Sequence, residues 1–184
     1  MKIFTIILFF TSLSYSQITK NNWLVGGSGN FKTTKTEKLS DGTKPYDDRT
    51  IFSFSPNVGY FFYDKLAGGI SLSYTYDNIY NQKYQYFGVG PFVRYYFLKT
   101  ENRINLFSQV EYQYGVGYSD GKKTSNNNNF NFKAGPSIFF NSSVALEFTL
   151  EYQLSDYDYL SGSGSQYKFT NFNIGVGFQI HLEK

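Results

Sequence analysis

The sequence predicts an all-β protein: an eight-stranded antiparallel up-and-down barrel that crosses a membrane. Three observations predict it. Side chains alternate between apolar and polar along most of the chain, Phe and Tyr are very abundant, and polar connections separate the alternating segments. A period of two is that of a strand, whose successive side chains point to opposite faces of the sheet. The 3.6-residue period of an amphipathic helix is not evident after residue 16, so helices are not expected.

The first four predicted strands each set an apolar face against a polar one. Trp23–Phe31 is rich in glycine, and Phe52–Phe62 alternates Phe, Pro, Val and Tyr with Ser, Asn and Gly. Leu66–Tyr76 sets Leu, Ile and Tyr against Gly, Ser and Thr. Phe87–Phe97 alternates in the same way, apart from two aromatic residues on its polar face. Each segment covers about ten residues, the length of a tilted transmembrane strand.

The last four predicted strands follow the same rule. Ile104–Gly117 sets Leu, Val and Tyr against Asn, Gln, Glu and Gly, and Phe130–Phe140 sets Phe, Ala and Ile against Asn, Lys, Gly and Ser. Val144–Leu154 and Phe172–Leu182 separate completely into an apolar and a polar face. The total of eight is an even number, which suits a closed antiparallel barrel.

The connections between these segments alternate in length. The short ones are 63–65, 99–102 and 141–143, and the longer polar ones are 32–49, 77–83, 119–129 and 155–168. Short periplasmic turns and longer extracellular loops are typical of outer-membrane barrels, so both termini are expected to be periplasmic. The asparagine run at 126–129 is expected in a flexible loop tip.

Alternation also occurs in soluble barrels such as lipocalins, so other features must decide which face meets lipid. The polar face carries few charges, and only 17% of all residues are charged, against about 25% in soluble domains. Aromatic residues gather toward the strand ends in two belts, as at the two interfaces of a membrane. These features turn the apolar face toward lipid and the polar face inward.

Five charged residues then fall inside a barrel that is only wide enough for side chains. They are Arg94, Glu111, Lys133, Glu147 and Glu151. An isolated buried charge is very costly, so these charges must pair. A hairpin turn centred on residue 142 places Lys133 opposite Glu151. We therefore expect a Lys133–Glu151 ion pair within a network of all five residues that fills the interior and is not a transport path.

The first sixteen residues, 1–16, are expected to be a signal peptide. Lys2 precedes an apolar run at 3–10, and small residues lie at 14–16, where a signal peptidase cleaves. The apolar run is shorter than the roughly 20 residues of a membrane helix. Cleavage after Ser16 leaves residues 17–184 as a single outer-membrane β-barrel domain.

Composition excludes several kinds of chemistry. The chain has no Cys and one His, His181, so disulfides, zinc–thiolate sites and cysteine nucleophiles are not expected. A net charge of +3 carried by scattered Lys and Arg favours no nucleic acid partner. The sequence therefore predicts no cofactor and no metal.

Two acidic pairs in the predicted loops are the remaining catalytic candidates. Asp47 with Asp48, and Asp156 with Asp158, could act as acid and base or bind Ca²⁺, but their spacing matches no calcium loop. Solvated loop carboxylates are the commoner case, so an enzyme is not expected. The Lys-rich loop 32–49 could contact the phosphates of lipopolysaccharide, although its own acidic residues nearly cancel its charge.

The last strand carries the most specific motif. A polar residue, a glycine and two spaced apolar residues occur at Asn173, Gly175, Phe178 and Ile180. This pattern resembles the assembly signal of the small outer-membrane β-barrel family, the OmpA-barrel and OmpX-like proteins, in particular the type found in Bacteroidota. The resemblance implies insertion into the outer membrane, and its lipid, by the barrel-assembly machinery. It also implies a non-enzymatic structural or interaction role, with a small-solute pore as the alternative.

Three Gly-Val-Gly steps at 88–90, 115–117 and 175–177 could suggest a phosphate-binding turn. None is followed by the third glycine and helix of a dinucleotide fingerprint. Each step places both glycines on the inward face. We expect them to give room to Phe92, Tyr96 and Phe107 inside the barrel.

Overall fold

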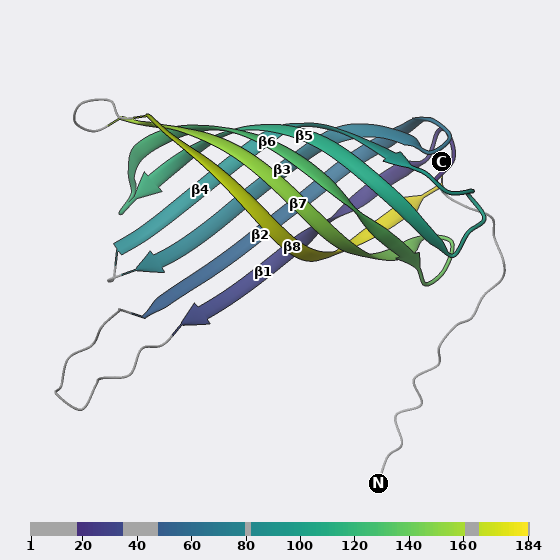
Figure 1. The fold of residues 1–184 in the computed structure, drawn as a ribbon, viewed down its shortest axis with the longest axis horizontal. Coiled ribbons are helices and arrows are strands. Elements are labelled where there is room, and N and C mark those ends of the chain that lie inside the picture. The colour runs from purple at the N-terminus through teal and green to yellow at the C-terminus, as the bar shows by residue number, and fades with distance from the viewer. Residues whose placement is uncertain (1–17, 35–47, 80–81, 161–165, 184) are drawn as a thin grey trace, which may run out of the picture.

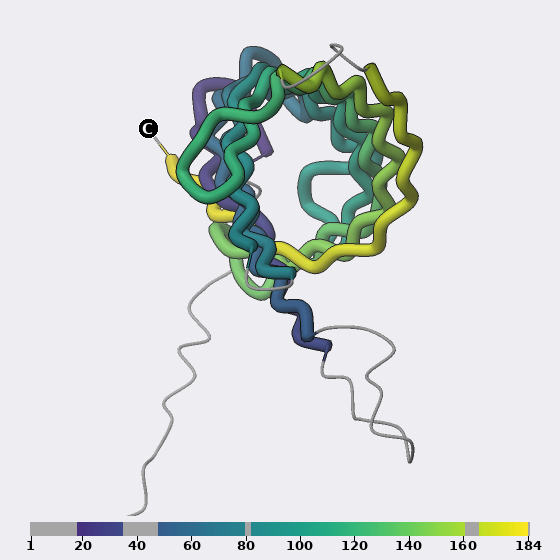
Figure 2. Tube along the Cα trace, turned by 90° about the vertical axis from the view of Figure 1, so that its left-hand side faces the viewer, coloured from purple at the N-terminus to yellow at the C-terminus, as the bar shows by residue number. Residues whose placement is uncertain are grey.

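The computed structural model describes residues 18–34, 48–79, 82–160 and 166–183. They form a closed barrel in which every strand is antiparallel to its neighbours in the chain and β8 pairs with β1 (Figures 1 and 2). The strands are β1 (Trp23–Thr34), β2 (Arg49–Tyr63), β3 (Leu66–Ile79), β4 (Gln82–Tyr96), β5 (Ile104–Ser119), β6 (Lys122–Phe139), β7 (Val144–Tyr159) and β8 (Gln166–Leu182). The predicted eight-stranded antiparallel barrel is confirmed.

The predicted two faces are visible in the exposure of β4. Val89 and Val93 lie on the outside and are 49% and 56% exposed, whereas Phe92, Arg94 and Tyr96 lie inside and are at most 3% exposed. The other strands alternate in the same sense, so the outer wall is built largely from exposed Phe, Tyr, Val, Leu and Ile. Monomeric soluble proteins rarely expose an apolar surface of this extent.

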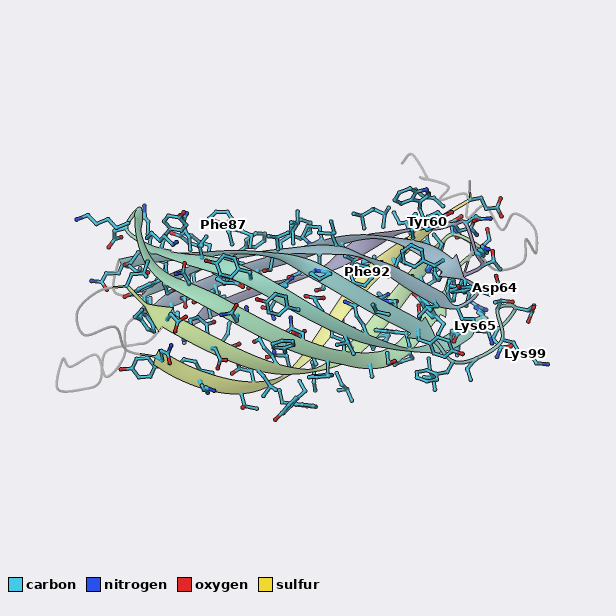
Figure 3. The ribbon with its side chains drawn as sticks, turned by 90° about the horizontal axis from the view of Figure 1, so that it is seen from above. Tyr60, Asp64, Lys65, Phe87, Phe92 and Lys99 are labelled. Atoms are coloured by element: carbon cyan, nitrogen blue, oxygen red, sulfur yellow. The ribbon has the colours of Figure 1, made fainter. Side chains whose placement is uncertain are left out.

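The two ends of the barrel differ in their connections. We call one the turn end: it carries the connections 64–65, 97–103 and 140–143, and Ile18 and Leu182 also lie there. Figure 3 shows Asp64, Lys65 and Lys99 at this end. The opposite rim, where β1 joins β2, β3 joins β4, β5 joins β6 and β7 joins β8, is the loop end.

One of the expected long loops is a tight turn. β5 and β6 are joined by Asp120 and Gly121 alone, whose φ angles of 47° and 80° are those of a type I′ hairpin turn. The asparagine run lies within β6, so the flexible loop tip was a wrong prediction. Tyr112 and Tyr114 of β5 donate hydrogen bonds to Asn128 and Asn126 at 2.8 Å and 3.1 Å, which favours continued pairing.

The other loop-end connections are also shorter than predicted, because polar pairs extend the strands beyond the apolar band. β3 reaches residue 79 and β4 starts at 82, so the predicted loop 77–83 is almost entirely strand. An ion pair joins β2 to β3, with Arg49 Nη2 2.5 Å from Asp77 Oδ2. Asp156 and Asp158, expected in a loop, belong to β7, where Asp156 is 3.9 Å from Lys168 of β8. Only the connection between β1 and β2 remains long.

The barrel is closed by a short hydrogen-bonded pairing of its first and last strands. Six Cα pairs join β1 to β8, from Trp23–Leu182 to Ser28–Gly177. Beyond them, β1 continues through residues 29–34 paired with β2 alone, and β8 residues 166–176 pair with β7 alone. We call these two unpaired edges the β1–β8 seam. Figure 1 shows β1 diverging from β8 toward the loop end.

In the part of the chain that the structure describes, no helix is long and apolar enough to span a membrane. The proposed signal peptide at 1–16 lies outside the described residues and stays a prediction. The same holds for Asp47 and for most of the lysines of the first loop.

Candidate functional site

The turn end of the interior is filled by a cluster that we call the apolar plug. Its members are buried, at most 2% exposed, and come from the chain before β1 and from five strands: Ile18, Leu24, Phe61, Ala67, Phe92, Tyr96 and Phe107. Lys65 donates its backbone N–H to the carbonyl of Ile18 at 2.8 Å, which fixes the entering chain against the plug. The plug leaves the barrel closed at this end.

Phe61 and Leu24 are plug members that the sequence analysis missed. Near the turn end of β2 both faces carry aromatic residues, so Phe61 sits between the half-buried Tyr60 and the exposed Phe62 and breaks the alternation. This run of consecutive aromatics was the available signal. It marks the level at which the interior changes from polar to apolar.

Against the plug, Arg94 of β4 and Glu147 of β7 form an ion pair across the interior. Arg94 Nη1 lies 2.8 Å from Glu147 Oε1, and both side chains are at most 4% exposed. Arg94 Nε also donates to Gln109 at 2.8 Å, and its guanidinium lies 4.5 Å from the ring centroid of Phe107. Ser137 donates to Glu147 at 3.2 Å. Each charge is thus both paired and hydrogen-bonded, as burial requires.

A second charged group lies further toward the loop end. Lys133 Nζ is 3.2 Å from Glu111 Oε2 and 4.0 Å from Glu151 Oε2. Glu111 is buried and also accepts hydrogen bonds from Gln109 and Asn131 at 2.7 Å and 3.2 Å. The register places Lys133 opposite Glu151, as the hairpin turn predicted from the sequence requires, but the shorter contact is with Glu111. Gln109 bonds both Arg94 and Glu111, so it links the two groups.

His181 is fully buried beside the plug. Its Nε2 lies 3.3 Å from the hydroxyl of Tyr96, and its ring centroid is 5.2 Å from that of Phe139 and 5.9 Å from that of Phe61. An imidazole enclosed in this way has no contact with the loop end. It is therefore part of the filling, not a base for a substrate that enters from that rim.

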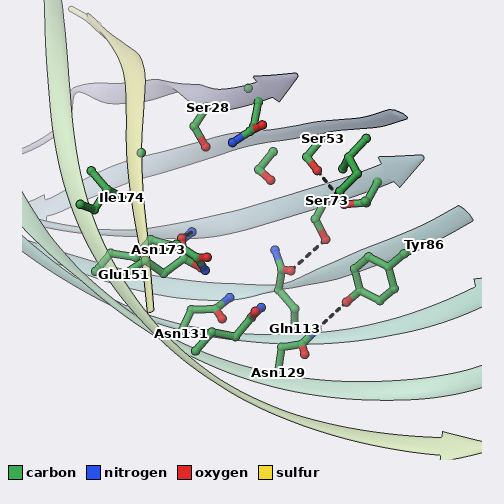
Figure 4. Close-up of a pocket in the computed structure, with 18 of the residues that line it drawn as sticks. Ser28, Ser53, Ser73, Tyr86, Gln113, Asn129, Asn131, Glu151, Asn173 and Ile174 are labelled. Atoms are coloured by element: carbon green, nitrogen blue, oxygen red, sulfur yellow. Dashed lines mark hydrogen bonds and ion pairs between the residues drawn. The ribbon is translucent and has the colours of Figure 1, made fainter. Parts of the chain in front are cut away.

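The loop-end half of the interior holds a cavity of about 850 Å³ (Figure 4). Its floor is formed by Glu111, Lys133 and Glu151, and its walls are mostly amides and hydroxyls. Hydrogen bonds organise the walls: Ser73 donates to Gln113 at 2.9 Å, and Asn129 donates to the hydroxyl of Tyr86 at 2.6 Å. A polar cup thus lies above charged residues and a closed plug.

The predicted role of the paired glycines is wrong. A methyl group added at Gly88 or Gly115 would collide with Tyr86, and one at Gly90 would collide with the carbonyl oxygen of Tyr112. Of the three aromatics that were expected to need room, Phe92 receives it from a different glycine, Gly59. Gly88 and Gly115 give room to Tyr86, whose ring points into the barrel because β4 begins earlier than predicted.

The four residues of the predicted assembly signal all lie in β8. Phe178 and Ile180 face outward, 55% and 41% exposed, at the end that pairs with β1. Asn173 and Gly175 lie on the unpaired edge at the seam, where an added Cβ at Gly175 would meet nothing within 4 Å. Their role in assembly stays a prediction.

The loop-end carboxylates that the structure describes lie on different parts of the rim. Asp48 is exposed before β2, while Asp156 and Asp158 lie on β7. The described residues contain no group of three or more His, Asp or Glu that could hold a metal ion. The structure describes two basic residues of the first loop region. Lys32 lies in β1, and Arg49 is paired with Asp77.

Comparison with known proteins identifies the family to which the chain is similar. A family model described as the outer membrane protein beta-barrel domain matches residues 3–179. No curated protein sequence matches the chain significantly.

Three solved structures share the fold. OprG of Pseudomonas aeruginosa superimposes with a TM-score of 0.55 at 10% identity, over 90% of this chain and 98% of that one. Neisserial surface protein A gives 0.55 at 13% identity, over 86% and 96%. The N-terminal β-barrel domain of Pseudomonas aeruginosa OprF gives 0.51 at 12% identity, over 89% and 98%. At such low identity these similarities show the fold alone.

Proposed function

We propose that this chain, which belongs to the outer membrane protein beta-barrel domain family, is a non-enzymatic and non-conducting barrel with a structural or interaction role. Family membership makes it an outer-membrane protein whose apolar wall contacts membrane lipid. One observation carries the proposal: the plug and the Arg94–Glu147 pair close the interior between the turn end and the cavity.

A continuous pore needs a water-filled path, and such a path is typical of barrels with many more strands than eight. The plug residues are at most 2% exposed, and the charged groups above them bond one another. The cavity therefore ends in the interior as a cup that opens at the loop end. Ile18, where the described chain begins, and Leu182, where β8 ends, both lie at the turn end, and we infer that this end is periplasmic.

The absence of an enzymatic role is supported by the placement of the reactive groups. His181 is enclosed by Phe61, Tyr96 and Phe139 at the turn end. Asp156 is half-exposed on the outer side of the loop end and lies near Lys168. Ala substitution of Asp48, Asp156 and Asp158 should leave the cellular phenotype of the protein unchanged.

Interaction at the loop end would use the rim of β1, β2, β7 and β8, where Lys32, Arg49 and Lys168 lie. Lipopolysaccharide phosphates are one chemically suitable partner for these cations. Insertion by the barrel-assembly machinery through the β8 signal belongs to the same proposal.

Conductance of the purified barrel in a planar lipid bilayer tests the proposal. We expect no stable channel at moderate voltage, because the plug blocks the turn end. A reproducible open state would favour the small-solute pore instead. Copurification in mild detergent then asks whether a protein partner accompanies the barrel, as an interaction role requires.

A further inference from the structure

The cavity reaches the outer surface through the β1–β8 seam. Its lining includes consecutive residues on both edges, 29–32 of β1 and 172–176 of β8. Neighbouring side chains of a strand point to opposite faces, so a cavity that touches five in a row passes around the strand edge. Among the described residues the three most exposed large apolar side chains, at 74%, 67% and 66%, flank this seam: Ile174, Phe31 and Phe172.

The seam lies partly at the depth of lipid. Ile174 is eight residues from Leu182, the turn-end limit of β8. A rise of about 3.3 Å per residue and a tilt of about 40° place Ile174 roughly 20 Å above that limit, inside an apolar band of about 25 Å. The unpaired backbone N–H and C=O groups of this edge therefore need a polar partner, since hydrocarbon offers none.

The floor of the cavity carries one more carboxylate than ammonium, and Lys32, the other cation in its lining, makes no ion pair with a described residue. Two carboxylates, Glu111 and Glu151, share the single ammonium of Lys133. Lys133 is closer to Glu111, and no hydrogen-bond donor of the described residues reaches the Glu151 carboxylate, which is 24% exposed. Glu151 pairs in register with Asn173 of β8, and Figure 4 shows both residues near Ile174 at the same side of the cavity.

We propose that the seam binds an amphiphile with an amine-bearing head, taken from the surrounding lipid leaflet. Its ammonium group pairs with Glu151 inside the cavity, and its acyl chain lies outside against Phe31, Phe172 and Ile174. Gly175 is the passage between the two, because a side chain added there would meet nothing within 4 Å and so would occupy open space.

The chemistry of the seam favours an amphiphile over an added peptide strand. The inner side is a polar cup with a net negative floor, whereas the outer side is a patch of exposed Phe and Ile. One molecule with a polar head and an apolar tail matches both sides. This proposal is independent of whether the barrel conducts solutes, so the bilayer experiment above and the experiments below can fail separately.

Cysteine cross-linking tests whether the seam is open, since the natural chain has no Cys. Val25 and Ile180 are opposite in the paired region, and Phe31 and Ile174 would be opposite if the same register continued. The pair Val25→Cys/Ile180→Cys should cross-link rapidly under mild oxidation, because directly opposed residues have suitable Cα distances. Phe31→Cys/Ile174→Cys should remain largely unlinked. Equal rates would mean a closed seam and would overturn the proposal.

Binding is tested by native mass spectrometry of the refolded barrel with lysophosphatidylethanolamine. We expect saturable binding that Glu151→Gln weakens about tenfold, the effect of losing one charge-assisted hydrogen bond. The matched control Glu101→Gln, on an exposed turn, should bind normally. Lysophosphatidylglycerol, with the same chain and no amine, should bind less tightly, and phosphoethanolamine without a chain should not bind detectably.

Gly175→Val tests the passage itself. It should abolish lysophosphatidylethanolamine binding, whereas Thr75→Val, on the opposite wall of the same cavity, should retain it. Heat-modifiable migration on gels confirms that each variant is folded. Binding that is unchanged in both Glu151→Gln and Gly175→Val would overturn the site. Binding of an extended peptide in preference to every lipid would replace the amphiphile with a strand.

Discussion

Arg94 and Glu147 join two nearly opposite walls of the barrel through an ion pair of 2.8 Å. Their strands, β4 and β7, share no direct pairing and are separated by β5 and β6 on one side. The pair therefore ties together walls that the hydrogen-bond ladders connect only around the circumference.

Breaking this pair on one side should destabilise the barrel strongly. Arg94→Met leaves Glu147 buried without its cation, a change that typically costs about 3–5 kcal/mol. Arg94→Met/Glu147→Leu should be much less harmful, because apolar replacement of both partners leaves no buried charge. Urea unfolding in lipid vesicles, followed by the fluorescence of the single Trp23, measures both variants. A double variant as unstable as the sum of Arg94→Met and Glu147→Leu, each measured alone, would contradict this role.

Lys133 should be coupled more strongly to Glu111 than to Glu151. The Glu111 contact is at 3.2 Å and buried, while that with Glu151 is at 4.0 Å and borders the cavity. Double-mutant cycles using Lys133→Met with Glu111→Gln or Glu151→Gln should give coupling of about 1–3 kcal/mol and below about 1 kcal/mol, respectively. Reversed values would mean that Glu151, the partner predicted from the hairpin register, is the stronger partner of Lys133.

Opening the plug should produce conductance. Phe61→Ala/Phe107→Ala removes two of its largest rings and should give small, flickering channels in a planar bilayer. The control Phe62→Ala/Leu106→Ala removes apolar side chains from the outward faces of the same strands. It should remain silent. Equal channel activity in the plug variant and the control would show that leakage comes from general destabilisation and not from the plug.

The inward glycines should differ sharply in their tolerance of a methyl group. At Gly90 a Cβ would collide with the carbonyl oxygen of Tyr112, which belongs to the backbone and cannot move away easily. Gly90→Ala should therefore destabilise by about 1–3 kcal/mol. Gly175→Ala meets open space and should be neutral or stabilising by about 0.5–1 kcal/mol. Equal unfolding midpoints would contradict the packing described at β5.

The strand count, the two faces and the inward position of the five charges could be predicted because lipid imposes a period of two on every strand. In contrast, the strand ends at the loop rim could not be read from that period. There the strands leave the apolar band, and their pairing depends on contacts such as Tyr114–Asn126 and Arg49–Asp77, which become visible only once the register is known.

The contacts of the site could be predicted only in part, for a similar reason. Hairpin register brought Lys133 opposite Glu151, but the closer partner, Glu111, lies on the other neighbouring strand. The Arg94–Glu147 contact crosses the interior, so no local pattern encodes it. The seam is a property of how β1 and β8 diverge in space, and these strands lie at opposite ends of the chain.

The proposed assembly signal can be separated from ordinary folding stability at Phe178. Its side chain is 55% exposed on the outer wall, so Phe178→Ala opens no interior cavity and should change the unfolding of the purified barrel little. If the barrel-assembly machinery recognises this residue, the amount of folded protein in the outer membrane should still fall in cells. Val176→Ala, also outward on β8 and 47% exposed, is the matched control and should leave that amount unchanged. If both variants reduce the amount of folded protein equally, or if the reduction only matches a loss of stability of the purified barrel, Phe178 is part of the outer wall and is not a recognition residue.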